Sequence, residues 1–436
     1  MRSRPLPEIE LDIVDLSHDG RGVARVDGKA VFVAGALTGE RVRARVVKRS
    51  RQFDEAEAVE VLTAAADRVA PLCAHFGTCG GCALQHLAPA AQIAAKQRTL
   101  LENLERIGHV APARVLEPLS GEPWRYRRRA RLSVKHVEKK GRTLVGFRER
   151  DGRFVAEIER CVVLHPAVGE RIGELAALVE TLDAKREIPQ IEVSIGDELA
   201  GLVFRHLTPL SEGDRAKLVA FAQASGLAIW LQPGGNDSVV PLYPADPRLS
   251  FALPHHGVEM AFEPLDFIQV NGAMNERMID HALALLAPQP NERVLDLFCG
   301  LGNFTLPLAR RCAHVTGVEG DAGLIARARA NAARQGFANV DFDVADLAGD
   351  QRSAPWAKAR WDALLLDPPR AGADKVLEYL PRKDCGRVVY VSCHPGSLAR
   401  DAGILVREHG FKLEAAGVMD MFPHTAHVES IALFVR

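Results

Sequence analysis

A repeating order of strand, turn and helix in the C-terminal part of the chain restricts its fold more than any other feature of the sequence. Short apolar runs suited to buried strands alternate there with longer stretches of helical periodicity. The expected elements, in chain order, are Val294–Leu297, Phe304–Cys312, Val315–Val318, Asp321–Gln335, Val340–Val344 and Ala363–Leu366. Such alternation is typical of a parallel sheet covered by helices on both faces, so we expect an α/β domain over residues 271–436.

The N-terminal residues have a different pattern. Short alternating runs separated by glycine-bearing turns occupy residues 1–65 and predict a small OB-like β-barrel. Basic residues alternate along Arg41–Arg49, which suits a surface that follows a phosphate backbone. Acids match the bases in number across the N-terminal segment as a whole, so an ordinary solvated strand face stays open as the alternative. Residues 66–270 mix helical and strand-like segments, and we assign them to a central α+β domain.

Composition narrows the class of protein. The chain is 47% hydrophobic and 25% charged, as soluble globular proteins are, and it has no run of about 18 uncharged apolar residues that could span a membrane. Its start, MRSRPLPEIELDIVD, has acids where a signal peptide needs an apolar stretch, so we expect a cytoplasmic protein. Its eight cysteines are then thiols or metal ligands and not disulfides.

Charge has to be judged locally. The formal net charge of −1 excludes a uniformly basic nucleic-acid binder. The segment from Trp124 to Arg153, however, contains twelve Lys or Arg residues and only three acids, with aromatic residues interleaved. This segment is the strongest candidate for an RNA-binding surface.

The first strand of the α/β part runs into a glycine turn that contains Gly300 and Gly302. Such a turn lets the backbone approach a ligand, although alone it is weak evidence and can merely shape a βαβ unit. Glu319 ends the next strand, 19 residues after Gly300, where a carboxylate can hold ribose hydroxyls, and Asp346 ends the third, where it can receive an adenine amino group. Bulky Phe304 follows where a dinucleotide site would want another glycine, which favours S-adenosylmethionine over NAD.

Two further strand ends suggest the chemistry. Asp367-Pro368-Pro369-Arg370 follows the fourth strand, with Arg370 where adenine and cytosine amino-methyltransferases often have an aromatic residue, and Cys393 ends the following strand. Carbon 5 of uracil becomes nucleophilic when a thiolate adds to carbon 6, so Cys393 is a candidate nucleophile, although a structural cysteine is the plainer interpretation. A base must then remove the carbon 5 proton, and Glu429 is our candidate.

Four other cysteines form a possible metal centre. Three of them make the pattern C-x5-C-x2-C in a glycine-rich loop, and the fourth follows the basic segment. The four candidate ligands are Cys73, Cys79, Cys82 and Cys161. Four thiolates suit zinc or an iron–sulfur cluster, and the single close pair is more typical of a cluster, but the spacing leaves both open. The cysteines interpreted as core residues are Cys299, Cys312 and Cys385.

Asp367-Pro368-Pro369-Arg370, Ser392-Cys393-His394-Pro395, His427-Val428-Glu429-Ser430 and the four cysteines together resemble the bacterial RNA uracil-5-methyltransferase family over nearly the whole chain. The cysteines and the barrel, which would be a TRAM domain, make the chain similar to the branch that modifies 23S ribosomal RNA at the uridine numbered 1939, because transfer-RNA members are expected to lack both.

The resemblance implies a Rossmann-like class I methyltransferase domain, S-adenosylmethionine as methyl donor and a 4Fe–4S cluster on the four cysteines. It also implies a set of residues around the donor and the target base. These are Gln269, Phe298, Asn303, Glu319, Asp346 and Asp367.

Several alternatives stay open. The same chemistry can act at another 23S site or on transfer RNA. A cytosine-5 methyltransferase that acts on RNA usually has a Pro-Cys motif and a second cysteine, both missing beside Asp367. A non-catalytic iron–sulfur protein that binds RNA leaves Cys393 and Glu429 unexplained. We expect 23S rRNA as the partner, no DNA or membrane partner, and a monomer.

Overall fold

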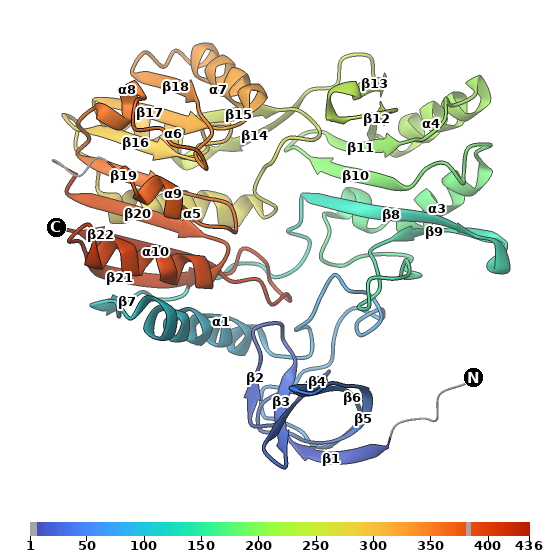
Figure 1. Cartoon of the computed structure of the whole chain (residues 1–436). Coiled ribbons are helices and arrows are strands. Elements are labelled where there is room, and N and C mark those ends of the chain that lie inside the picture. Colours follow the sequence, from blue (N-terminus) through green and yellow to red (C-terminus); the bar gives the residue numbers. More distant parts are fainter. Residues whose placement is uncertain (1–6, 381–384) are drawn as a thin grey trace.

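The computed structural model describes residues 7–380 and 385–436, so the first six residues of the expected barrel segment lie outside the described part. The chain forms a small barrel, a central sheet with its helices, and an α/β part (Figure 1). In the described residues, no helix is both long and apolar enough to cross a membrane.

The N-terminal barrel is confirmed, with strand order β1-β5-β6-β4-β3-β2. The strands are β1 (Glu8–Asp12), β2 (Asp15–Leu16), β3 (Gly22–Val26), β4 (Lys29–Ala34), β5 (Arg41–Arg49) and β6 (Phe53–Thr63). Along β5, Arg45 pairs with Glu8 on β1 and Lys48 pairs with Glu55 on β6. The basic side chains of β5 are therefore neutralised across the ladder, which favours the solvated strand face over a free basic stripe.

The central part is a six-stranded sheet in the order β13-β12-β11-β10-β8-β9, with helices packed against it (Figure 1). Its elements are β8 (Arg129–Val137), β9 (Arg142–Gly146), α2 (Pro166–Gly169), α3 (Ile172–Thr181), β10 (Gln190–Ile195), β11 (Ala200–Arg205), α4 (Glu212–Ser225), β12 (Ala228–Gln232) and β13 (Val240–Tyr243). The basic segment thus supplies the strands β8 and β9, at one edge of this sheet.

The C-terminal part contains an eight-stranded sheet in the order β18-β17-β16-β19-β20-β22-β21-β7, in which the edge strand β7 (Arg114–Val115) comes from an earlier part of the chain. Its strands and helices are α5 (Gly272–Leu286), β16 (Arg293–Leu297), α6 (Thr305–Ala309), β17 (His314–Glu319), α7 (Ala322–Arg334), β18 (Val340–Val344), α8 (Pro355–Lys358), β19 (Ala363–Leu366), α9 (Asp374–Leu377), β20 (Arg387–Ser392), α10 (Pro395–Arg407), β21 (Lys412–Met419) and β22 (Glu429–Val435). The first five strands are parallel, as expected, and β22 runs antiparallel between β20 and β21, so the far side of the sheet is mixed. A two-stranded sheet, β14 (Leu249–Leu253) and β15 (Val258–Phe262), lies beside α7.

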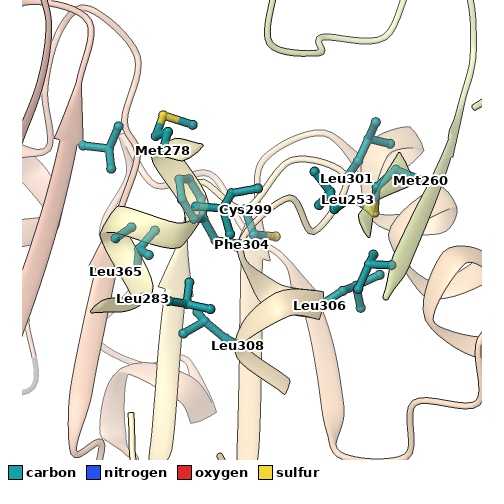
Figure 2. Close-up of a cluster of buried hydrophobic side chains, with 14 of the residues drawn as sticks. Leu253, Met260, Met278, Leu283, Cys299, Leu301, Phe304, Leu306, Leu308 and Leu365 are labelled. Carbon is teal, nitrogen blue, oxygen red and sulfur yellow. The ribbon is translucent and has the colours of Figure 1, made fainter. Parts of the chain in front are cut away.

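Apolar side chains anchor the glycine turn after β16 from below. Cys299 and Phe304, on either side of the two glycines, point into the same cluster as Met278 and Leu283 of α5 (Figure 2). This burial confirms Cys299 as a core residue, as it does for Cys312 and Cys385. Packing of these two side chains therefore holds the turn in place.

Helix α1 (Pro89–Asn103) connects the other parts to the α/β part. It continues into a single π-helical turn (Leu104–Gly108) and packs against β21 and α10 (Figure 1). The short strand β7 (Arg114–Val115) then extends the eight-stranded sheet beside β21. A segment that we expected in the central domain therefore covers the edge of the catalytic sheet.

Candidate active site

The turn after β16 adopts the left-handed backbone conformation that favours glycine. Gly300 and Gly302 have φ of 55° and 87°, and Phe298 has φ of 65°, all in the left-handed region. Glu319, at the end of β17, accepts hydrogen bonds from the backbone N–H of Gly300 at 3.2 Å and of Gly320 at 2.7 Å. The expected carboxylate therefore lies directly against the turn.

Asp296 is a site residue that the sequence interpretation missed. It is fully buried on β16, and Thr305 donates a hydrogen bond of 2.5 Å to one of its carboxyl oxygens. The other oxygen has no partner among the described residues. Burial, with Asp367 and Glu319 nearby, raises the pKa of Asp296 to about 8. A lone acid in an apolar strand just before a glycine turn was the available signal.

The other residues expected to surround the methyl donor differ in burial and in hydrogen-bond partners. Asn303 exchanges two side-chain hydrogen bonds with Asn275 of α5, at 2.8 and 2.9 Å. Gln269 is half-buried in the segment between β15 and α5. Asp346 lies two residues beyond β18, not at its end, and its exposed side chain accepts a hydrogen bond from the backbone N–H of Ala348. The strand itself spans Val340–Val344, as expected, and Asp346 lies in the loop that follows it.

Cys393 and Glu429 are neighbours in space. Ser392 of β20 is the register partner of Ser430 of β22, so Cys393 follows one strand end where Glu429 begins the other. The hydroxyl of Ser430 donates to the backbone carbonyl of Ser392 at 3.1 Å and closes this end of the ladder. The sequence expectation placed both residues in one crevice, and the structure brings them together there.

A cavity of about 600 Å³ opens on Cys393. It is bounded by the barrel, by α1 and by the segment before β22. Its lining includes His18, Asp19, Thr99, Asn103, Ile107, Arg370, Cys393, His394, Ala426, His427 and Val428. The N-terminal barrel therefore helps to form the catalytic cavity, a role that barrel residues in isolation do not suggest.

Acidic groups dominate the electrostatics around the thiol. Burial, followed by the negative charges of Glu429 and Asp367, raises the pKa of Cys393 to about 11, and Arg370 opposes this. Burial also raises the pKa of Asp367 to about 7. The pKa of Glu429 lies well above its usual value because the side chain is buried and Asp367 is close, while Lys96 acts in the opposite direction. The cysteine is thus a neutral thiol until a proton acceptor and a substrate are present.

The four remaining candidate cysteines line a single pocket, together with Phe76, Phe147 and Arg160. A β-carbon on Gly80 would lie 3.0 Å from the carbonyl oxygen of Arg148, so only glycine lets this loop approach the basic segment so closely. Burial raises the pKa of Cys82 to about 12. Among the described residues, no three His, Cys, Asp or Glu side chains are arranged so as to hold a metal ion.

A larger groove of about 1360 Å³ runs between the barrel and the central sheet. The barrel contributes Arg21 and Lys48, and the cysteine loop contributes Gly80–Ala83. The basic segment contributes Arg131, Arg148, Arg150 and Arg153. The basic segment therefore faces the barrel across this groove.

Neighbouring strand ends of the eight-stranded sheet carry the glycine turn, Glu319 and Asp367, at the carboxyl edge where sheets of this kind form a ligand crevice. This charge suits a cationic nucleoside such as S-adenosylmethionine, with its sulfonium and ammonium groups, better than a pyrophosphate. Fold and crevice together define an S-adenosylmethionine-dependent methyltransferase of the Rossmann-like class.

Comparisons with known proteins identify the family. Residues 252–436 match the tRNA (Uracil-5-)-methyltransferase family, and residues 7–59 match the TRAM domain. The 23S rRNA (uracil(1939)-C(5))-methyltransferase RlmD of Xanthomonas euvesicatoria is 62% identical over 97% of this chain and 96% of its own length. The protein of the same name from Stenotrophomonas maltophilia is 61% identical over 98% and 97%. The chain therefore belongs to the 23S rRNA (uracil-C5)-methyltransferase family.

A solved structure shares the whole architecture. The Pyrococcus abyssi tRNA (uracil-54, C5)-methyltransferase, in complex with S-adenosyl-L-homocysteine, aligns with a TM-score of 0.74 at 23% identity, over 98% of this chain and 100% of that one. This alignment includes the barrel, so the expectation that transfer-RNA members lack the barrel does not hold for this neighbour. The architecture alone does not select the RNA.

Proposed function

We propose that this chain transfers a methyl group from S-adenosylmethionine to carbon 5 of the uridine equivalent to position 1939 of 23S rRNA. The observation that carries the proposal is the pairing of Ser392 with Ser430, which sets Cys393 beside Glu429 at the cavity. The high identity to relatives named for this reaction supports the choice of RNA.

Cys393 begins the reaction by adding to carbon 6 of the uracil ring. Its sulfur forms a bond to that carbon as the thiol proton leaves to a nearby acceptor, and the electrons of the carbon 5–carbon 6 double bond become an enolate. S-adenosylmethionine, when bound, supplies the electrophilic methyl group to carbon 5. Arg370, which opposes the rise of the Cys393 pKa, favours the thiolate at this stage.

Glu429 completes the cycle as the general base. Its carboxylate takes the carbon 5 proton, the double bond reforms, and the bond between Cys393 and carbon 6 breaks to release the thiolate. The products are 5-methyluridine, S-adenosylhomocysteine and one proton. Because Glu429 is buried and its pKa is raised, it holds a proton strongly once it has received one.

The donor lies against the glycine turn in this proposal. The residues assigned to the donor and the target base are Gln269, Phe298, Asn303, Glu319, Asp346 and Asp367. Glu319, beside Gly300, is placed to accept the ribose hydroxyls, and Asp346 suits the adenine end because it is exposed at the next strand. The unpartnered oxygen of Asp296 is a further polar group in this crevice.

We also propose a 4Fe–4S cluster on Cys73, Cys79, Cys82 and Cys161. Their common pocket supports it, and so does the electrostatic influence of Cys161 and Cys73 on Cys79. Burial raises the pKa of Cys79, Cys82 and Cys161, so a bound metal would have to displace protons from these thiols. The cluster would tie the cysteine loop to the basic segment and to Cys161.

We assign a separate role to each part of the chain. We assign residues 1–65 to an RNA-binding barrel, 66–270 to a central domain with the cluster and basic segment, and 271–436 to methyl transfer, with α1 docked on the last. A monomer supplies every residue assigned here, and cytoplasmic 23S rRNA is the partner that the groove would bind.

Release of tritium from carbon 5 of labelled uridine tests the proposal. Unmodified 23S RNA and transfer RNA serve as parallel substrates, with and without S-adenosylmethionine. Donor-dependent release from 23S RNA is expected. Release from transfer RNA alone would move the target, and release from neither would favour a non-catalytic RNA-binding protein.

A further inference from the structure

A lysine is buried behind the catalytic strand. Lys96 of α1 is 3% exposed, and its ammonium lies 2.7 Å from a carboxyl oxygen of Asp420. It also donates a hydrogen bond of 2.9 Å to the backbone carbonyl of Phe422. Burying an ammonium group is costly even when it is paired, so this position demands a reason.

The lysine holds the segment that leads to Glu429. Met419, the residue before Asp420, is the register partner of Glu429 in the ladder of β21 and β22. Helix α1 binds the same segment a second time, because the backbone N–H of His424 donates to the Gln92 side chain at 2.9 Å. Lys96 and Gln92 of α1 thus hold the first part of the segment that connects β21 to Glu429.

Charged groups approach Glu429 from several elements. Asp367 comes from the end of β19, Cys393 from the end of β20 and Asp420 from the end of β21, while Lys96 comes from α1. Lys96 is the cation that lowers the pKa of Glu429, against burial and Asp367. Burial lowers the pKa of Lys96 itself, whereas Asp420 and Glu429 raise it.

We propose that Lys96 is a positioning residue for the catalytic base: from α1 it holds the segment next to Glu429 and favours the carboxylate form that removes the carbon 5 proton, and Asp420 moderates this effect. The inference rests on the proposed function, because it concerns the step that Glu429 performs. Lys96 has no covalent part in the reaction.

The two partners should act in opposite directions. Replacing Lys96 by methionine removes the positive charge and retains most of the apolar stem, so Glu429 binds its proton more tightly. Replacing Asp420 by asparagine retains the shape and leaves the lysine charge uncompensated, so Glu429 ionises more readily. If Lys96 only supported the fold, both variants would lose activity, and the pH dependence of proton removal by Glu429 would not shift in opposite directions.

The experiment follows the decay of the methylated covalent adduct between enzyme and 23S RNA as a function of pH. In Lys96→Met the midpoint of the decay profile should move up by about one pH unit, with more adduct at neutral pH. In Asp420→Asn it should move down. Arg98→Met, on the exposed face of the same helix, should behave as the unchanged protein.

RNA with 5-fluorouridine at the target separates the two claims. Fluorine at carbon 5 cannot leave as a proton, so this RNA reports only the addition of Cys393 and the methyl transfer. Both variants should form this adduct at the normal rate. Absence of adduct in the unchanged protein would refute the proposed function, whereas normal adducts with an unshifted decay profile in both variants would overturn the role of Lys96. If Lys96→Met does not fold, the downward shift in Asp420→Asn decides.

Discussion

Cys393 and Glu429 meet because two strands that are well separated in sequence close one antiparallel ladder. The nucleophile follows a parallel strand, and the base begins the strand inserted beside it. Their mutual electrostatic effect is unfavourable, since the charge of Glu429 raises the pKa of Cys393. Two negative charges side by side are unfavourable, so the Cys393 thiolate and the Glu429 carboxylate are expected to form at different stages of the reaction.

Substituting these two residues should separate the halves of the reaction. Cys393→Ala should abolish both the covalent adduct and methyl transfer while RNA binding persists. Glu429→Gln should slow turnover by about 10²–10⁴-fold and accumulate the adduct, because the carbon 5 proton is no longer removed. Denaturing gels and tritium release measure the two effects. Cys312→Ala, in the core, is the control and should keep normal turnover; normal turnover by Cys393→Ala would end its assignment.

Asp296 should make the stability of the ligand-free protein depend on pH. Its pKa rises from 3.8 to about 8 on folding, so the folded protein keeps a proton that the unfolded chain has lost. The stabilisation is complete below about pH 4 and decreases as pH rises toward 8, by about 1.4 kcal/mol per pH unit. Urea unfolding between pH 5.5 and 7.5 should therefore show a loss in the unchanged protein that is about 2–3 kcal/mol larger than in Asp296→Asn.

The matched control for this measurement is Asp246→Asn, at an exposed carboxyl group paired with Arg248. It should retain the pH dependence of the unchanged protein. Equal slopes in the unchanged protein and in Asp296→Asn would mean that the buried carboxyl is ionised in the folded state.

At the scale of elements, the cysteine loop depends on one close backbone contact. The N–H of Gly80 donates to the carbonyl of Arg148 at 2.9 Å, and the next residues after Cys82 donate to the carbonyl of His424. The loop thereby touches both the basic segment and the segment before Glu429. Its shape matters to two neighbouring parts as well as to the proposed cluster.

Two glycine substitutions in this loop should differ in iron content. Gly80→Ala places a β-carbon 3.0 Å from one backbone oxygen and 3.1 Å from another, so the loop or the basic segment must shift by a few tenths of an ångström next to Cys79. In Gly81→Ala the nearest atom is 3.5 Å away, an ordinary contact. Protein purified without oxygen should contain roughly four irons and absorb broadly in the visible range, as should Gly81→Ala, whereas Gly80→Ala should lose most of the iron. Stoichiometric zinc in colourless protein would refute the cluster.

On the scale of the whole molecule, the groove between barrel and central sheet contains paired basic residues, such as Arg131 with Glu192, and also Arg150, which forms no ion pair with another described residue. Arg45 on the barrel is paired with Glu8, so its charge is largely cancelled. Arg150 is exposed in the groove lining. RNA affinity should therefore depend on the groove and not on the outer face of β5.

Salt dependence of RNA binding can test this difference. Arg150→Ala should weaken binding and make the plot of log association constant against log salt less steep by about 0.7–0.9, the effect of one phosphate contact. Arg45→Ala should leave both values nearly unchanged. The reverse result would place the RNA on the outer face of the barrel.

The sequence alone determined the features that depend on neighbouring residues. The glycine turn, the strand ends that carry Glu319, Asp367 and Cys393, the barrel and the cysteine pattern all lie in contiguous stretches, where periodicity and residue type report local conformation directly. The resemblance carried by those motifs named the family that the comparisons then established.

Only the tertiary structure decided which polar groups are buried together. Lys96 and Asp420 are separated by 324 positions, and nothing in an alanine-rich helix marks its one lysine as the partner of a catalytic strand. The antiparallel insertion of β22 and the pairing of the β5 charges likewise depend on contacts between distant segments. Burial changes the free energy of a charge far more than local sequence does, and burial is a property of the packed molecule.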